Sequence, residues 1–177
     1  SAEYGFVSED EVPIKEDHQL LPLHPYGVSK VGQDLSAYQY FKNFGLDTIR
    51  LRVFGTTGPR KVGDVCSDFA RQIVDIEMKK RAPVMYVGNL EVKRDLTDVR
   101  DMVKALLLLT EKGKAGEVYN ICSGKAYRVG DILNKLLEIS GVDVEVKVDP
   151  KRLRPSDEPV IMGSNSKIKK DCGWQPR

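Results

Sequence analysis

Helix-like and strand-like segments alternate along most of the chain, and this alternation constrains the fold more than any single motif does. Apolar residues at helical spacing predict helices over residues 25–44, 64–81, 100–112 and 130–139. Short segments rich in strand-forming residues predict strands over residues 48–54, 84–87, 118–122 and 144–148. Such alternation is typical of an α/β fold with a largely parallel sheet. The later strands and the helix that begins near Asp64 are expected to form a second, smaller lobe.

The composition is that of an ordinary folded protein. The 177 residues are 41% hydrophobic and 31% charged, and the formal net charge is +2. So small a charge gives no electrostatic reason for nucleic-acid binding. The short basic clusters at residues 79–81 and 169–170 fall at predicted helix ends, where cations interact favourably with the helix dipole. We therefore expect no nucleic-acid partner.

Cysteine and histidine usage argues against a metal centre. The three cysteines, Cys66, Cys122 and Cys172, are far apart and odd in number, so neither a metal-binding spacing nor a disulfide framework emerges. The two histidines, His18 and His24, both fall in a predicted loop, and no zinc site is expected. Unpaired cysteines favour a reducing cytoplasmic environment.

The chain offers no membrane-spanning candidate and no signal peptide. Its longest apolar run covers residues 105–109, which is far too short to cross a bilayer. We expect no membrane partner. The chain starts at Ser1 without a methionine, which suggests processing or a piece of a longer protein.

A tyrosine and a lysine four residues apart, Tyr26 and Lys30, share one face of the predicted helix at 25–44. A phenol beside an ammonium ion suits proton transfer in redox chemistry at a carbinol or carbonyl carbon, because the cation stabilises the phenolate. Tyr38 and Lys42 repeat this spacing on the same helix, so spacing alone does not identify the site. Tyr26 follows a proline at the helix entrance, where a side chain can face a cleft. Tyr38 is instead expected in the core, in register with Val28, Val31, Leu35 and Phe41.

The segment before this helix is long and polar. Residues 6–25 contain three prolines and predict a loop that lines a cleft and leads into the Tyr26 helix.

A dinucleotide site needs glycines in a turn from a strand into a helix. Gly55 and Gly58 are followed by Pro59 without a helix, and Gly113 and Gly116 follow a helix. A nicotinamide enzyme with this sequence would therefore lack its glycine-rich cofactor half here.

Seven segments, taken in order, resemble the nucleotide-sugar branch of the extended short-chain dehydrogenases/reductases. They are residues 1–5 (SAEYG), 25–30 (PYGVSK), 52–59 (RVFGTTGP), 94–101 (RDLTDVRD), 116–121 (GEVYNI), 152–157 (RLRPSD) and 173–176 (GWQP). The likeness is greatest to the members that act on GDP-sugars, the 4,6-dehydratases and 4-keto-6-deoxy-mannose reductases. It implies a partial Rossmann-like parallel sheet that lacks its N-terminal glycine-rich half, plus a small α/β substrate-binding lobe.

The resemblance also implies a division of the chain. Residues 1–62 would be the C-terminal part of a dinucleotide-binding domain. Residues 63–177 would mainly form the nucleotide-sugar-binding lobe, with residues 95–125 returning to the Rossmann-like sheet.

The catalytic and cofactor-binding roles follow from the same resemblance. Tyr26 would be the acid/base at the sugar C4 oxygen, and Lys30 would bind the nicotinamide ribose. Val53 and Phe54 would lie near the nicotinamide of NAD or NADP. The hydroxyl catalyst of the family falls just upstream of the chain, which leaves Ser1 as a stand-in.

The resemblance assigns substrate binding to residues in both parts of the chain. Arg94 and Arg154 would grip the diphosphate, a role that suits the planar guanidinium, with a surface ion pair as the alternative. Asp157 would meet the nucleotide ribose or orient Arg154. Gly55 replaces an asparagine common after the Arg-x-Phe unit, which removes one expected substrate hydrogen bond.

Three functions remain open from the sequence. A reductase of a 4-keto GDP-sugar is preferred over a GDP-mannose 4,6-dehydratase, because Ala2 stands where the dehydratases carry a glutamate base and Glu3 is one place out of register. A binding module or inert fragment is the third, since the chain by itself is expected to be incomplete and inactive. In the resembling enzymes the Tyr26 helix also helps to form a dimer, which Ala37, Tyr40 and Phe44 would permit, so a homodimer or higher homo-oligomer is expected.

Overall fold

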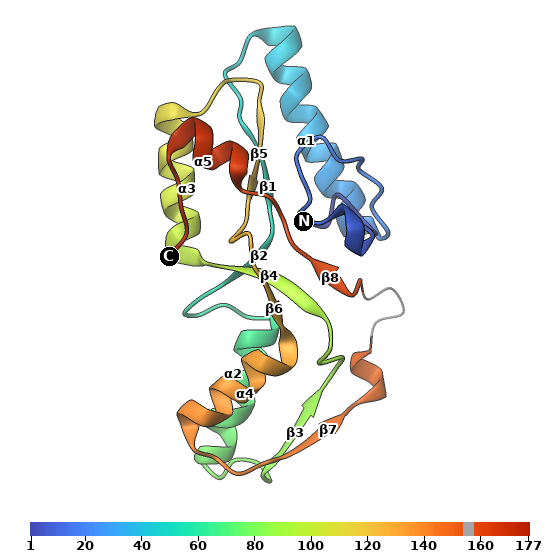
Figure 1. Ribbon diagram of the computed structural model, residues 1–177, viewed down its shortest axis with the longest axis vertical. Coiled ribbons are helices and arrows are strands. Elements are labelled where there is room, and N and C mark those ends of the chain that lie inside the picture. The colour runs from blue at the N-terminus through green and yellow to red at the C-terminus, as the bar shows by residue number, and fades with distance from the viewer. Residues whose placement is uncertain (154–157) are drawn as a thin grey trace.

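The computed structural model describes residues 1–153 and 158–177 of the chain (Figure 1). Its α-helices are α1 (Pro25–Phe44), α2 (Val65–Glu77), α3 (Val99–Lys112), α4 (Val129–Ser140) and α5 (Ser166–Cys172). Its strands are β1 (Arg50–Val53), β2 (Gly55–Thr57), β3 (Val84–Val87), β4 (Lys93–Asp98), β5 (Val118–Ile121), β6 (Ala126–Arg128), β7 (Glu145–Val148) and β8 (Val160–Ile161). Two short 3-10 helices, η1 (Glu9–Glu11) and η2 (Pro150–Arg152), complete the elements.

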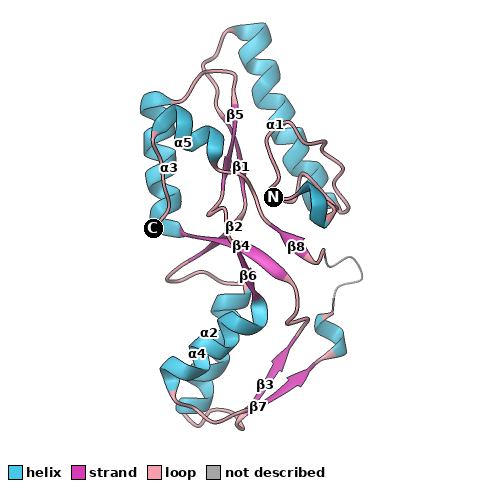
Figure 2. Ribbon diagram, viewed as in Figure 1, coloured by secondary structure: helices cyan, strands magenta, loops and turns pink. Residues whose placement is uncertain are grey.

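One part of the molecule is a parallel strand pair between helices. β1 pairs in parallel with β5, from Arg50 opposite Val118 to Val53 opposite Ile121. Figure 2 shows α1 on one side of this pair and α3 with α5 on the other. The apolar core between the strands and α3 and α5 includes Ala105, Leu109, Tyr119, Ile121, Ile168 and Trp174. The predicted α/β fold class with parallel strands is confirmed.

The opposite end of the molecule has a separate core. β3 pairs in parallel with β7, and α2 and α4 pack against each other beside them (Figure 1). Buried apolar residues from all these elements except β7 make this core, among them Phe69, Ile73, Met85, Val87 and Leu133. The side chains of α2 follow the apolar period expected of a helix that begins after Asp64, which accepts a capping hydrogen bond from the Ser67 backbone at 2.6 Å.

A mixed sheet joins the two parts. β4 pairs in parallel with β2 and β8 and in antiparallel with β6. The sequence pattern did not predict these four strands, because they are short, polar or interrupted by glycine. They form through hydrogen bonds between segments that are far apart in the sequence. Residues 55–57 form β2 directly after the strand predicted at residues 48–54.

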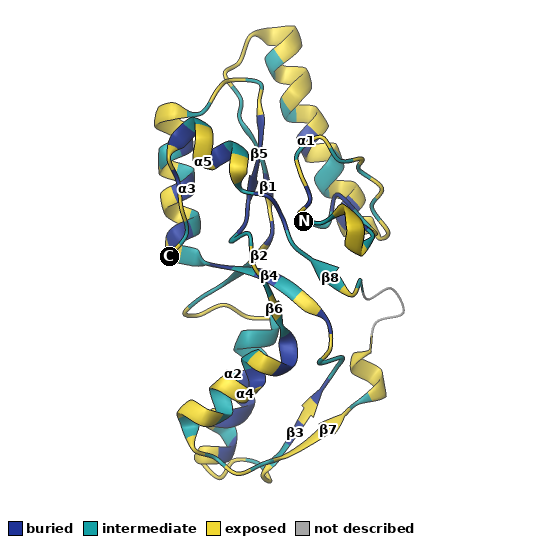
Figure 3. Ribbon diagram, in the orientation of Figure 1, coloured by how far each residue is buried: buried dark blue, intermediate teal, exposed yellow. Residues whose placement is uncertain are grey.

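The prediction that Tyr38 lies in the core is wrong. Its exposed fraction is 41%, and Val28 and Leu35 are more exposed still. Figure 3 shows α1 exposed along most of its length. Among the described residues of α1, Gly27 and Asp34 are the buried ones, so this helix is held by a close backbone contact and an ion pair instead of an apolar stripe.

The apolar run at residues 105–109 lies in α3 and is only partly buried. Leu109 is buried, but Leu107 is 60% exposed, because one face of α3 covers the strands and the other faces solvent. No helix in the described part of the chain combines the length and apolar character needed to cross a membrane.

Candidate functional site

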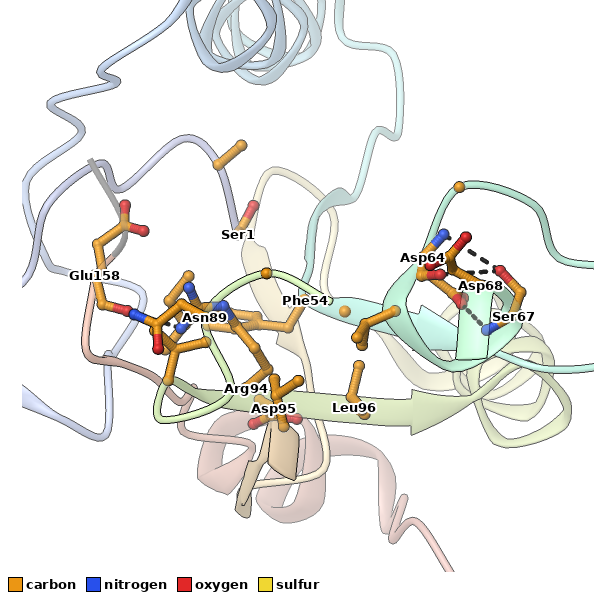
Figure 4. A pocket seen from close by; sticks show the side chains of 18 of the residues that line it. Ser1, Phe54, Asp64, Ser67, Asp68, Asn89, Arg94, Asp95, Leu96 and Glu158 are labelled. Atoms are coloured by element: carbon orange, nitrogen blue, oxygen red, sulfur yellow. Dashed lines mark hydrogen bonds between the residues drawn. The ribbon is translucent and has the colours of Figure 1, made fainter. Parts of the chain in front are cut away.

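A cavity of about 1000 Å³ lies where the two parts of the molecule meet (Figure 4). Its walls come from the N-terminal segment, the end of β1, the first turns of α2, the loop after β3, β4 and η2. Segments 1–7, 53–71, 88–96, 151–153 and 158–161 thus contribute to one concave surface. Concave sites with a few convergent polar groups are where small ligands bind.

The fold brings five of the expected site residues to this cavity. Ser1, Val53, Phe54, Gly55 and Arg94 all line it. Figure 4 shows Ser1, Phe54 and Arg94 in the middle of the view, between Glu158 on one side and the first turn of α2 on the other. Phe54 is almost fully buried and forms part of the wall, whereas Val53 is partly exposed. Arg154 and Asp157 lie outside the residues that the structure describes.

Tyr26 and Lys30 stand beside the cavity instead of in its wall. Pro25 begins α1, and His24 caps it by accepting a hydrogen bond on Nδ1 from the Gly27 backbone at 3.1 Å. His24 lines the cavity, and its ring lies 6.3 Å from the Tyr26 ring. The Tyr26 side chain is therefore close to a residue of the cavity wall, and it is 62% exposed.

The two Tyr-x-x-x-Lys pairs have nearly the same internal geometry. Lys30 Nζ lies 5.5 Å from the centre of the Tyr26 ring, and Lys42 Nζ lies 5.7 Å from the centre of the Tyr38 ring. Lys30 also donates a hydrogen bond to Gln33 at 2.8 Å. What differs is location, because only the first pair adjoins residues that line the cavity.

A buried polar network fixes α1 against the strands. Asp34 accepts hydrogen bonds from Arg50 Nη1 at 2.8 Å and from Arg52 Nε at 2.7 Å. Arg52 donates in turn to the Tyr4 hydroxyl at 3.2 Å, and Tyr4 donates to Asn120 at 2.6 Å. Burial raises the pKa of Tyr4 to about 12, so its hydroxyl stays a neutral donor. The network sets the position of the helix that carries Tyr26 and Lys30.

A second buried carboxylate fixes β4 next to Arg94. Asp95 accepts hydrogen bonds from the Ser123 backbone and hydroxyl, both at 2.7 Å, and from the backbones of Gly124 and Gly163. Burial raises the pKa of the Asp95 carboxyl, although these hydrogen bonds favour its charged form. Arg94 itself donates to the Glu158 carbonyl at 2.7 Å.

Gly55 is where two backbones approach closely. A Cβ atom at this position would lie 2.6 Å from the carbonyl oxygen of Asp95 and 2.9 Å from the Leu96 side chain. An asparagine, which the resemblance led us to expect, would not fit without movement of β4. The glycine is therefore explained by the pairing of β2 with β4.

Sequence reasoning missed several charged residues of the cavity. Asp68 and Arg152 line it, and Arg152 Nη1 donates to Asp68 Oδ2 at 2.7 Å across 84 residues of sequence. Arg152 fell within a segment of the family resemblance but received no role. The sequence pattern indicates only that a helix begins near Asp64, yet Asp64 also lines the cavity. No pattern in the sequence linked these residues, because they meet only in the fold.

Within the described residues, no cluster of histidine, cysteine, aspartate or glutamate could hold a metal ion.

Comparison with known proteins places this chain in a family. The family model described as GDP-mannose 4,6 dehydratase matches residues 1–177. The GDP-6-deoxy-D-mannose reductase of Pseudomonas aeruginosa is 34% identical over 174 residues, which cover 98% of this chain and 57% of that protein. The UDP-glucose 4-epimerase of Corynebacterium glutamicum is 29% identical, with 99% of this chain and 56% of that protein covered.

Solved structures agree with these relatives. The structure of RMD from Pseudomonas aeruginosa complexed with NADPH matches with a TM-score of 0.94 and 32% identity, and covers all of this chain and 59% of that one. The UDP-glucose 4-epimerase of Thermotoga maritima with UDP-glucose matches with a TM-score of 0.87 and 29% identity, over 99% of this chain and 55% of that one.

The chain thus spans between half and two thirds of the length of these relatives. The family match extends from its first residue to its last. This chain belongs to the GDP-mannose 4,6 dehydratase family, within the extended short-chain dehydrogenases/reductases.

Proposed function

We propose that the chain is part of a nucleotide-sugar oxidoreductase that reduces the C4 ketone of a GDP-4-keto-6-deoxy sugar, with NAD or NADP as cofactor. The observation that carries this proposal is the Tyr26–Lys30 pair next to His24, which lines the same cavity as Arg94. The Pseudomonas aeruginosa reductase and the NADPH-bound structure support this choice of substrate and cofactor class.

The residues at the end of β1 fit a nicotinamide ring. Val53 offers an apolar side chain at the cavity, and Phe54 closes the wall there. Lys30 lies one helical turn from Tyr26, where its ammonium group can reach a ribose hydroxyl. When bound, the reduced nicotinamide supplies the hydride that the C4 carbonyl carbon accepts.

The side chains of this chain handle the proton and the anionic substrate. Tyr26 donates its phenolic proton to the C4 oxygen as the carbonyl becomes an alcohol, and the Lys30 ammonium stabilises the phenolate that remains. Ser1, which lines the cavity, is the hydroxyl available to the same oxygen. Arg94 binds the diphosphate, and Arg154 and Asp157 keep their proposed diphosphate and ribose roles.

A second candidate is the GDP-mannose 4,6-dehydratase reaction, which the description of the matching family favours. Elimination of water needs a base for the C5 proton. Ala2 lines the cavity at the position where that base is expected, whereas Glu3 is buried and is not one of the described residues that line it. We therefore rank the reductase first.

Tyr38 provides a matched control for a test of Tyr26. In the intact protein, Tyr26→Phe is expected to lower kcat for NADPH oxidation with a GDP-4-keto-6-deoxy sugar by about 100-fold or more. Tyr38→Phe should leave kcat unchanged, because Tyr38 has the same lysine spacing away from the cavity. Equal activity of the two variants would refute the role of Tyr26.

Two other results would change the assignment. Conversion of GDP-mannose without net cofactor use would establish the dehydratase reaction. GDP-sugar binding without turnover of either substrate would support a binding protein.

We also propose a cytoplasmic homodimer. The cysteines are free, which suits a reducing compartment, and Tyr40 and Phe44 present apolar surface on the exposed side of α1. Light scattering coupled to size exclusion should give twice the monomer mass, and substitution of Phe44 by Glu should reduce it to the monomer.

A further inference from the structure

Arg152 is a cavity residue without a role in the function proposed above. We propose that its guanidinium binds the diphosphate of the nucleotide ligand, and that Asp68 and Gln72 hold it in position. This inference rests on the proposed function and adds a ligand-binding residue to it.

The backbone at Arg152 is fixed by a capped turn. Asp149 donates its backbone N–H to Val87 at 2.9 Å, and its side chain accepts from the Lys151 backbone at 3.0 Å. Arg152 N–H then donates to the Asp149 carbonyl at 2.9 Å. A Cβ atom on Gly88 would lie 2.8 Å from the Arg152 carbonyl oxygen, so a glycine is required for η2 to lie this close to the end of β3.

The Arg152 side chain is fixed by a chain of hydrogen bonds that starts at β3. Gln72 exchanges two hydrogen bonds with the Tyr86 backbone, at 3.0 and 3.1 Å. The same Gln72 amide donates to Asp68 Oδ2 at 2.8 Å, and Arg152 Nη1 donates to that oxygen at 2.7 Å. Gln72 is 2% exposed within an otherwise apolar face of α2, so its orientation is strongly determined.

The geometry leaves donors available at the cavity. A guanidinium carries five N–H groups in a planar fork; Asp68 engages it through Nη1, and an Asp149 carboxylate oxygen lies 3.9 Å from its Nε. The Arg152 side chain remains 41% exposed and lines the cavity. A planar fork matches the oxygens of a phosphate, and a side chain that is already ordered loses less entropy when a ligand binds. Lys61 and Lys151 line the same cavity and add positive charge.

Calorimetric titration of the protein with GDP and with guanosine tests the inference. Arg152→Gln is expected to weaken GDP binding by about tenfold or more and to leave guanosine binding unchanged, because guanosine has no phosphate. Arg152→Lys keeps the charge without the fork and should give an intermediate loss. Asp68→Asn should weaken GDP binding by a smaller factor, since the guanidinium keeps its charge but loses its anchor. Arg100→Gln is the matched control, because this exposed arginine pairs with Asp98 away from the cavity.

The outcomes separate this inference from the proposed function. Unchanged GDP affinity in Arg152→Gln, or an equal loss for GDP and guanosine, would overturn the diphosphate role. Tighter GDP binding in Asp68→Asn would show that Asp68 competes with the ligand and does not position Arg152. No GDP binding by the unmodified protein would instead count against a GDP-sugar substrate altogether.

Discussion

Asp34 is the residue whose removal should most disturb the position of α1. Its side chain is only 5% exposed and forms ion pairs with Arg50 at 2.8 Å and Arg52 at 2.7 Å. Substitution by alanine leaves the Arg52 guanidinium, which is 6% exposed, without its carboxylate. Removing one partner of a buried ion pair costs about 3–5 kcal/mol. Arg52 keeps hydrogen bonds to the Tyr4 hydroxyl and to the Glu16 carbonyl, so we expect a loss of about 3 kcal/mol, at the lower end of that range.

Urea denaturation followed by circular dichroism measures this loss as a change in the free energy of unfolding. Glu138→Ala is the matched control, because Glu138 forms an exposed ion pair with Lys135 that should contribute less than about 0.5 kcal/mol. In a double-mutant cycle, Asp34→Ala combined with Arg52→Met should cost clearly less than the sum of the single changes. A loss below about 1 kcal/mol for Asp34→Ala would refute the claim that this ion pair anchors the helix.

Two further predictions concern β4 and its ends. Hydrogen bonds from Arg100 lower the pKa of Asp98 to about 2, so as the pH falls below about 4 the unfolded chain binds a proton at Asp98 before the folded protein does. The free energy of unfolding should therefore decline between about pH 4 and pH 2. Asp98→Asn should flatten this part of the plot of stability against pH in acid-denaturation measurements. Gly55→Ala should lower the free energy of unfolding by about 1–3 kcal/mol in thermal denaturation, because its Cβ would lie 2.6 Å from the Asp95 carbonyl. An unchanged melting temperature would show that β2 and β4 separate at little cost.

The main helices and strands could be predicted from the sequence, because residues that are close together in the chain determine them. The sequence predicted a helix over residues 25–44, and α1 spans Pro25–Phe44, with Gly45 in the left-handed conformation directly after it. The strands β1, β3, β5 and β7 lie within the segments predicted for them. The order of the motifs along the chain also identified the family, because the chemistry needs particular residue types in a particular order.

The tertiary structure alone decided which faces are covered and which distant residues meet. A helical period shows that Tyr38 shares a face with Val28 and Leu35, but it does not show whether another element covers that face, and here none of the described residues buries it. Asp68 and Arg152 are 84 residues apart, and their ion pair exists only because α2 and η2 both reach the end of β3. Burial and ion pairing depend on contacts between remote segments, and a pattern of neighbouring residues carries no information about those contacts.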